Sequence, residues 1–113
     1  MKPPFQNPLA ALEFEIVEEK AAALGRLGRR LEAGLASLRD FDAEHGSAIG
    51  AGSSPVPDAP LRRKTLLAEV AEAYWYFMVQ REACGLRDSA SIIRAYGVPR
   101  EVVIRAGPNW GRR

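Results

Sequence analysis

Several residue types that build common functional sites are scarce in this chain of 113 residues. A single cysteine, Cys84, excludes a disulfide within the chain, and a single histidine, His45, leaves no set of imidazole ligands. The sequence also lacks a Walker loop, a GxGxxG fingerprint, a CxxC pair and an HExxH pair. These absences predict a protein that is not an enzyme, with no catalytic residue, no metal ligand and no cofactor-binding residue.

Long apolar runs are also missing. The longest uncharged stretch, residues 46–57, is rich in Gly, Ser and Pro and far shorter than the roughly 20 apolar residues that span a bilayer. The first 15 residues bring prolines and glutamates before any apolar run, which is unlike a secretory signal peptide. Together with the lone cysteine, which fits a reducing compartment, this pattern predicts a cytoplasmic protein that does not interact with a membrane.

Charge is unevenly distributed although the net charge is only +2. Residues 1–60 carry 6 basic against 9 acidic residues, a net of −3, and residues 61–113 carry 10 against 5, a net of +5. We expect the acidic half to pair with the basic half of the same chain or of a second copy. The basic cluster at residues 62–64 is then expected to pair with the glutamates of residues 13–19, and a phosphate-binding patch is the alternative.

The first half of the chain has the pattern of one long amphipathic helix. Asn7 followed by Pro8 is a typical helix start. Apolar residues then recur at gaps of three and four, with one doubled gap across Lys20, which marks one face of a helix. This face consists of Leu9, Leu12, Ile16, Leu24, Leu27, Leu31, Leu35, Leu38 and Phe41. The pattern predicts a helix over residues 8–45.

The rest of the chain is predicted to complete a single all-α domain over residues 1–113. Composition indicates a flexible loop over residues 46–59. A central helix rich in aromatic residues follows at 60–85, and residues 88–107 form a corner of two short helices around Gly97.

Four consecutive aromatic residues, Tyr74 to Phe77, lie in the middle of the predicted central helix. Successive residues differ by about 100° around a helix, so these side chains point to most of its sides. We therefore expect other helices to contact this one on more than one side. A ligand pocket around residues 74–78, with Arg81 and Glu82 as its polar groups, is a less favoured interpretation.

The length of the first helix predicts self-association. It exceeds the central helix by about 11 residues, roughly 16 Å, so a monomer would leave part of its apolar face exposed. We expect a homo-oligomer, most simply a two-fold dimer in which the long helices cross at Gly25 and Gly28. The residues predicted to form this interface are Leu24, Leu27, Leu31, Leu35 and Leu38. The glycines inside the helix are expected to mark close approach of another backbone.

The corner at residues 88–107 resembles the helix-turn-helix motif of bacterial DNA-binding proteins. Gly97 takes the position of the turn glycine, and apolar residues flank it at offsets that would hold two helices at a steep angle. The apolar residues are Ile92, Ile93, Tyr96, Val98, Val103 and Ala106. The resemblance implies a second helix that presents Arg100, Glu101 and Arg105 to DNA.

Two hypotheses on function therefore come from the sequence. The favoured one is a non-catalytic helical protein that oligomerises or binds other proteins. The alternative is a small dimeric helix-turn-helix protein that binds nucleic acid. As a whole, the chain resembles the small all-helical proteins of unknown function that are common in bacterial genomes.

Overall fold

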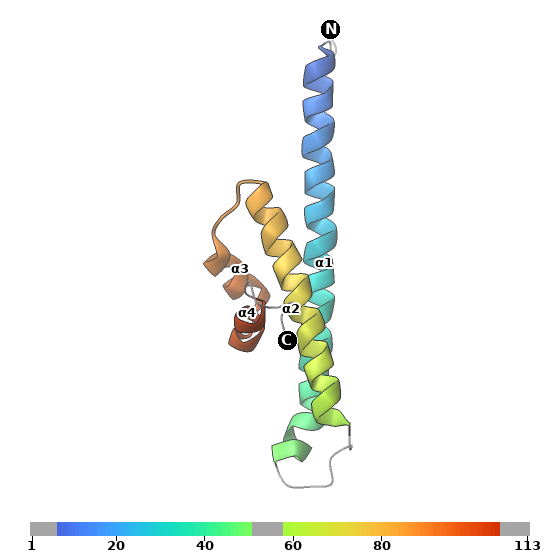
Figure 1. Cartoon of the computed structure of the whole chain (residues 1–113), viewed down its shortest axis with the longest axis vertical. Coiled ribbons are helices and arrows are strands. Elements are labelled where there is room, and N and C mark those ends of the chain that lie inside the picture. The colour runs from blue at the N-terminus through green and yellow to red at the C-terminus, as the bar shows by residue number, and fades with distance from the viewer. Residues whose placement is uncertain (1–6, 51–57, 107–113) are drawn as a thin grey trace.

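The computed structural model describes residues 7–50, the last five of them by backbone alone, and residues 58–106. These residues form four helices: α1 (Pro8–Gly50), α2 (Ala59–Ala83), α3 (Ser89–Tyr96) and α4 (Arg100–Arg105). Helices α1 and α2 form an antiparallel hairpin, and α3 and α4 lie on the other side of α2 (Figure 1). The all-α prediction and the order of its elements are confirmed.

Local signals in the sequence set most helix ends. The side chain of Asn7 accepts a hydrogen bond from the backbone N–H of Leu9 at 2.9 Å and so caps α1. Asp88 caps α3 in the same way, through the N–H of Ser91 at 3.2 Å. Gly97 ends α3 at φ 64°, a left-handed conformation that glycine adopts without strain. These three ends lie where the sequence predicts them.

The C-terminal end of α1 differs from its prediction. The helix continues to Gly50 rather than ending at His45, because a glycine inside a helix costs only about 1 kcal/mol and does not by itself end it. Residues 46–50 therefore belong to α1 and not to the predicted loop, whose residues 51–57 lie outside the described part of the chain. Residue 107 of the predicted corner also lies outside it.

The hydrophobic core is built around α2, which is buried on two sides. Its residues Val70 and Phe77 pack with buried leucines of α1, and Val102 of α4 is completely buried in the same cluster. Tyr74 is also buried there and Trp75 packs against it, so three residues of the aromatic run serve the core, whereas Tyr76 is 44% exposed. The expectation of a central helix that is contacted on more than one side is confirmed.

The molecule is elongated because α1 is much longer than anything packed on it. The described helices lie within overall extents of 71 × 29 × 22 Å, and the N-terminal part of α1 projects beyond the other three helices (Figure 1). Among the described residues, no helix has an apolar stretch long enough to cross a membrane.

Candidate interaction site

The antiparallel register of the hairpin determines how much of α1 is left uncovered. Asp42 is beside Arg63, Gly34 beside Val70 and Gly28 beside Phe77. Moving toward the start of α1 therefore means moving toward the end of α2. Since α2 ends at Ala83, six residues after Phe77, its coverage of α1 ends about six residues before Gly28. We call the remaining residues 8–22 the arm; they measure about 22 Å at 1.5 Å per residue.

The predicted dimer interface needs correction. Leu31, Leu35 and Leu38 are 0%, 1% and 2% exposed within the single chain, because α2 covers this part of α1. They cannot also form a surface between two folded chains, so this part of the prediction is wrong. Leu24 and Leu27 are half-buried and pack against the edge of the same core.

Gly28 and Gly34 of α1 do mark close approach, but inside one chain, whereas a Cβ on Gly25 would meet only the Arg29 side chain of the same helix. A Cβ atom on Gly28 would lie 3.1 Å from the Tyr96 hydroxyl oxygen and 3.4 Å from the Phe77 ring, and one on Gly34 would lie 3.2 Å from Val70. These short distances explain why glycine is needed where α2 and α3 pack on α1. The predicted crossing of two long helices at Gly28 is therefore wrong, because that surface is occupied by the chain itself.

The arm carries the apolar surface that the core does not use. Leu9, Leu12, Ile16 and Val17 are 59%, 52%, 46% and 64% exposed. Their spacing continues the face that holds the buried leucines further along α1, since gaps of three and four, with one doubled gap across Lys20, connect Leu9 to Leu38 along one side of the helix. The face that packs on α2 in the second half of α1 is thus solvent-exposed on the arm.

Charge divides the arm into two sides. Glu15 and Glu18 lie away from the apolar face, whereas Glu19 lies at its edge beside Leu12 and is 3.8 Å from Arg26 about two turns further on. Glu13 and Lys20 are different, because they lie within the apolar face, two turns apart and on either side of Ile16 and Val17. Both are exposed, and neither makes a hydrogen bond or ion pair with another described residue.

A groove of about 450 Å³ lies at the base of the arm, between α1 and α3. Phe77 and Arg81 of α2 and Ile92 and Tyr96 of α3 line it, and its α1 side consists of Ala21, Leu24, Gly25, Gly28, Arg29 and Glu32. The groove adjoins the apolar face of the arm at Leu24, which lies on the same side of α1 as Lys20 and Val17. The arm face and this groove together form the candidate interaction site.

The two-helix corner is a packing element on α2, and its first helix also approaches α1. Val98, Val102 and Ala106 are buried, so the apolar pattern that resembles a helix-turn-helix motif serves the core. Arg100 is exposed and Arg105 half-buried. Five positions apart, they point about 140° away from each other around α4. A helix of only six residues with these two arginines on different sides does not form one surface for DNA.

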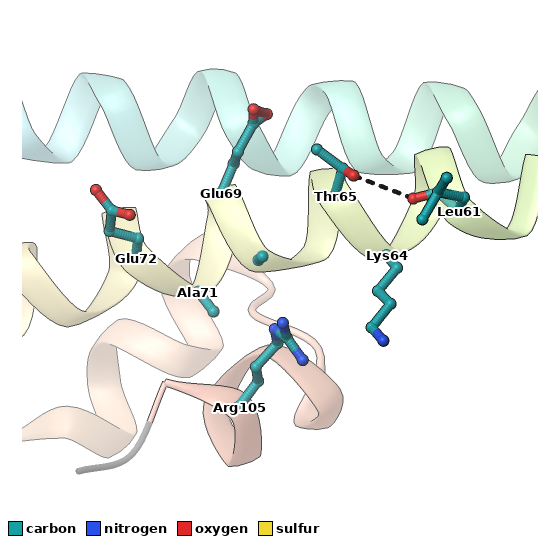
Figure 2. A pocket seen from close by; sticks show the side chains of 8 residues that line it. Leu61, Lys64, Thr65, Glu69, Ala71, Glu72 and Arg105 are labelled. Carbon is teal, nitrogen blue, oxygen red and sulfur yellow. Dashed lines mark hydrogen bonds between the residues drawn. The ribbon is translucent and has the colours of Figure 1, made fainter. Parts of the chain in front are cut away.

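Arg105 points toward α2 rather than outward. It lines a shallow groove of about 370 Å³ beside Lys64, Thr65, Glu69 and Glu72 (Figure 2). The carboxylates of Glu69 and Glu72 point toward α1 and away from Arg105 (Figure 2), and Glu72 accepts a hydrogen bond from Arg30 at 3.2 Å. Since Arg105 faces α2 and Arg100 lies on another side of α4, the nucleic-acid alternative stays a prediction without support from this geometry.

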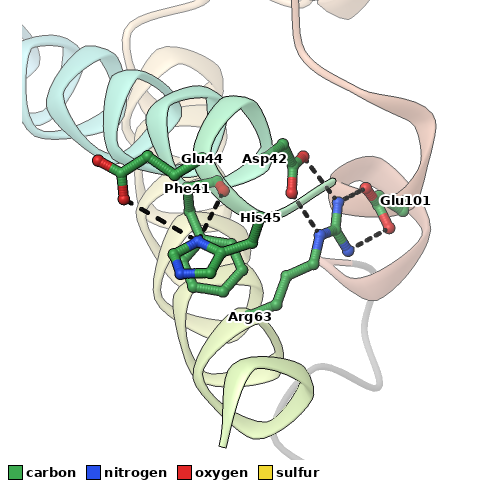
Figure 3. Close-up of polar contacts among 6 residues, drawn as sticks. All are labelled: Phe41, Asp42, Glu44, His45, Arg63 and Glu101. Atoms are coloured by element: carbon green, nitrogen blue, oxygen red, sulfur yellow. Dashed lines mark hydrogen bonds and ion pairs between the residues drawn. The ribbon is translucent and has the colours of Figure 1, made fainter. Parts of the chain in front are cut away.

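Arg63 joins three helices through its guanidinium group. It donates to Asp42 of α1 at 2.8 and 3.1 Å and to Glu101 of α4 at 2.6 and 3.1 Å (Figure 3). These charge-assisted hydrogen bonds hold the pKa values of Asp42 and Glu101 below their usual range and raise that of Arg63. Glu101, predicted as a DNA-contacting residue, thus has a structural partner.

The expected pairing of the basic cluster at residues 62–64 with the arm glutamates does not occur at Arg63. The antiparallel hairpin places the start of α2 beside the end of α1, so Arg63 meets Asp42. Glu13 lies almost 30 residues before Asp42, or roughly 43 Å along the helix axis.

We predict that Arg63→Gln lowers the free energy of unfolding by about 1 kcal/mol at neutral pH, because all three side chains are partly exposed and solvent screens their attraction. A carboxylate with a lowered pKa stabilises the fold above its unfolded pKa and loses this contribution as pH falls through its folded pKa. The difference from wild type should therefore begin to shrink as pH falls below about 4 and vanish at still lower pH, below the folded pKa values of the two carboxylates. Urea unfolding across pH measures it, with Lys64→Gln as control. A difference that persists unchanged in acid would contradict the assignment.

A metal site is not formed by the described residues. Within residues 7–45 and 58–106, no group of three or more His, Cys, Asp or Glu side chains is placed to hold a metal ion. His45 stacks on Phe41 with 4.3 Å between ring centroids (Figure 3), and its Nδ1 atom lies 3.1 Å from the Phe41 carbonyl oxygen. Because α1 extends to Gly50, His45 is part of the helix body rather than its last residue.

The fold and its surface define an all-helical protein in which a short bundle carries one projecting helical arm. The chain belongs to a family of unknown function (DUF6665), which matches residues 32–109. The matched span covers the second half of α1 together with α2, α3 and α4, so it contains most of the packed core. No curated protein and no solved structure matches the chain.

Proposed function

We propose that this chain is a non-catalytic, cytoplasmic interaction protein that forms a homodimer through the arm. The observation that carries the proposal is the exposed apolar face of residues 8–22. A helix of 15 residues is marginally stable in water without packing on one side. The core gives the arm no such packing along most of its length, so a partner helix on this face supplies the missing burial.

A second copy of the chain is the partner that this surface fits. The arm presents the same helix face that packs on α2 further along α1, so a helix of similar character completes the pattern. Burial of its exposed Leu, Ile and Val side chains contributes about 1.5–3 kcal/mol for each side chain that becomes fully buried. In a two-fold pair of arms each of these positions is buried once in each chain. The total burial is that of a dimer with modest affinity and a specific geometry.

The solution mass of the full chain tests this proposal. Sedimentation equilibrium across micromolar concentrations is expected to show reversible conversion between 12.4 kDa and twice that mass. The expected concentration dependence follows from an interface made by one helix of each chain rather than by the core. A single species at the monomer mass over the whole range would contradict the proposal.

A further inference from the structure

The charges inside the arm face carry information about the direction in which two arms pack. Glu13 and Lys20 are seven residues apart, which is close to two helical turns, so both project from the middle of the apolar face. Ile16 and Val17 lie between them, and the apolar face has no other charged residue between Leu9 and Leu24. One acidic and one basic residue placed symmetrically about an apolar centre form a self-complementary pattern.

We infer that two copies of the chain pack their arms antiparallel, with Glu13 of each opposite the partner's Lys20. This inference rests on the proposed function. In an antiparallel pair whose two-fold axis passes between Ile16 and Val17, positions at equal distance from the centre face each other. Glu13 then lies opposite the partner's Lys20, and Lys20 opposite the partner's Glu13. Both ion pairs flank an apolar centre made of Ile16 and Val17 from both chains.

The parallel arrangement is disfavoured by the same two residues. In a parallel pair in register, Glu13 would face the partner's Glu13 and Lys20 the partner's Lys20. Like charges at the centre of a helix interface oppose association, and such pairs commonly set orientation in helical dimers. Of the remaining arm glutamates, Glu15 and Glu18 lie away from the contact, and Glu19, at the edge of the face, is paired with Arg26 of its own helix.

The antiparallel register also places the start of the partner's arm at the groove at the base of the arm. Leu9 and Leu24 are equally far from the centre between Ile16 and Val17, so the partner's Leu9 lies opposite Leu24. Leu24 lines the groove with Gly25, Ile92 and Tyr96. The start of the partner's arm thus contacts this groove, and the interface extends from the arm onto α3.

Charge reversal tests the register. Glu13→Lys and Lys20→Glu each replace two attractive contacts per dimer with two repulsive ones. Each is expected to raise the dimer dissociation constant about 30-fold, or about 2 kcal/mol. The double variant Glu13→Lys/Lys20→Glu exchanges the two charges and restores the pairs, so its dissociation constant should return to within a few-fold of wild type. Glu18→Lys, on the opposite face, is the control and should leave the constant unchanged.

The outcomes separate this inference from the proposed function. If wild type dimerises and the apolar arm face is required, but the single reversals have no effect, the dimer stands and the antiparallel register is wrong. Failure of the double variant to recover also overturns the register. A wild type that stays monomeric overturns both proposals.

Cysteine cross-linking measures orientation independently of charge. In a Cys84→Ser background, Val17→Cys places the two thiols near the two-fold axis, so a short bismaleimide should join the chains efficiently. Leu9→Cys places the thiols 15 residues apart along the pair, roughly 22 Å, and should give little cross-linked dimer. Efficient cross-linking at residue 9 would show a parallel pair and overturn the inference.

Discussion

Leu31→Ala is expected to lower the free energy of unfolding by about 3–5 kcal/mol, the largest effect of any single change proposed for this chain. Leu31 is completely buried between α1 and α2, and the cluster around it contains Leu35, Val70 and Phe77. Truncation removes its transfer free energy and leaves a cavity that rigid helices fill only in part. Small domains are stable by only about 5–15 kcal/mol, so the loss is a large fraction of the total.

Urea unfolding followed by far-UV circular dichroism measures this effect. Leu61→Ala is the matched control, because the same atoms are removed from a helical leucine that is 66% exposed. The control should change stability by no more than about 0.5 kcal/mol. If the two variants unfold at the same urea concentration, Leu31 is not in the core of the chain.

Leu12→Glu/Ile16→Glu is expected to convert the dimer into a folded monomer. Both side chains are about half exposed in the single chain, so the monomer tolerates glutamate at these positions. In the dimer, four apolar side chains are replaced by four carboxylates at the centre of the contact. The dissociation constant should rise by at least about 100-fold, since each 1.4 kcal/mol of lost interaction is a factor of ten.

The matched control for the arm variant adds the same charge elsewhere on α1. Ala22→Glu/Ala36→Glu introduces two glutamates on the side of the helix away from the apolar face, at exposed positions. It should sediment as wild type does. A Leu12→Glu/Ile16→Glu variant that keeps the wild-type mass would show that the arm face is not the contact.

The sequence was sufficient to predict the helices because their ends depend on neighbouring residues. Asn7 before Pro8, Asp88 before Ser89 and the glycine after Tyr96 act within one turn, and the structure shows each acting where expected. The end of α1 was missed for the opposite reason. Gly46 resembles a stop signal, yet a helix ends at a glycine only when that residue leaves the helical conformation.

The location of the uncovered helix face was harder to predict. The difference in length between the two long helices correctly indicates that part of α1 has no α2 beside it. Which part of α1 is uncovered depends on where the chain connects α1 to α2. Because residues 51–57 join the end of α1 to the start of α2, the shorter helix returns along the second half of α1. Leu31, Leu35 and Leu38 then become core, and Leu9, Leu12 and Ile16 remain exposed.

Ion pairs between residues far apart in the chain could not be predicted from sequence patterns. The partners of Arg63 lie 21 positions before it and 38 positions after it, and only the packing of three helices brings Asp42 and Glu101 together. The role of the corner at residues 88–107 could not be predicted from sequence patterns either. Its apolar spacing is required both for packing on a core and for a DNA-binding motif, and the choice depends on where Arg100 and Arg105 point.

Hydrogen–deuterium exchange of the full chain at two protein concentrations tests the central claim most directly. An arm that packs on a second copy should exchange its backbone amides more slowly at the higher concentration, with the change confined to residues 9–22 and the nearby groove. The amides around Leu31 should exchange at the same slow rate in both samples. Exchange of the arm that is fast and independent of concentration would contradict the account, because it would show that no second copy covers this face.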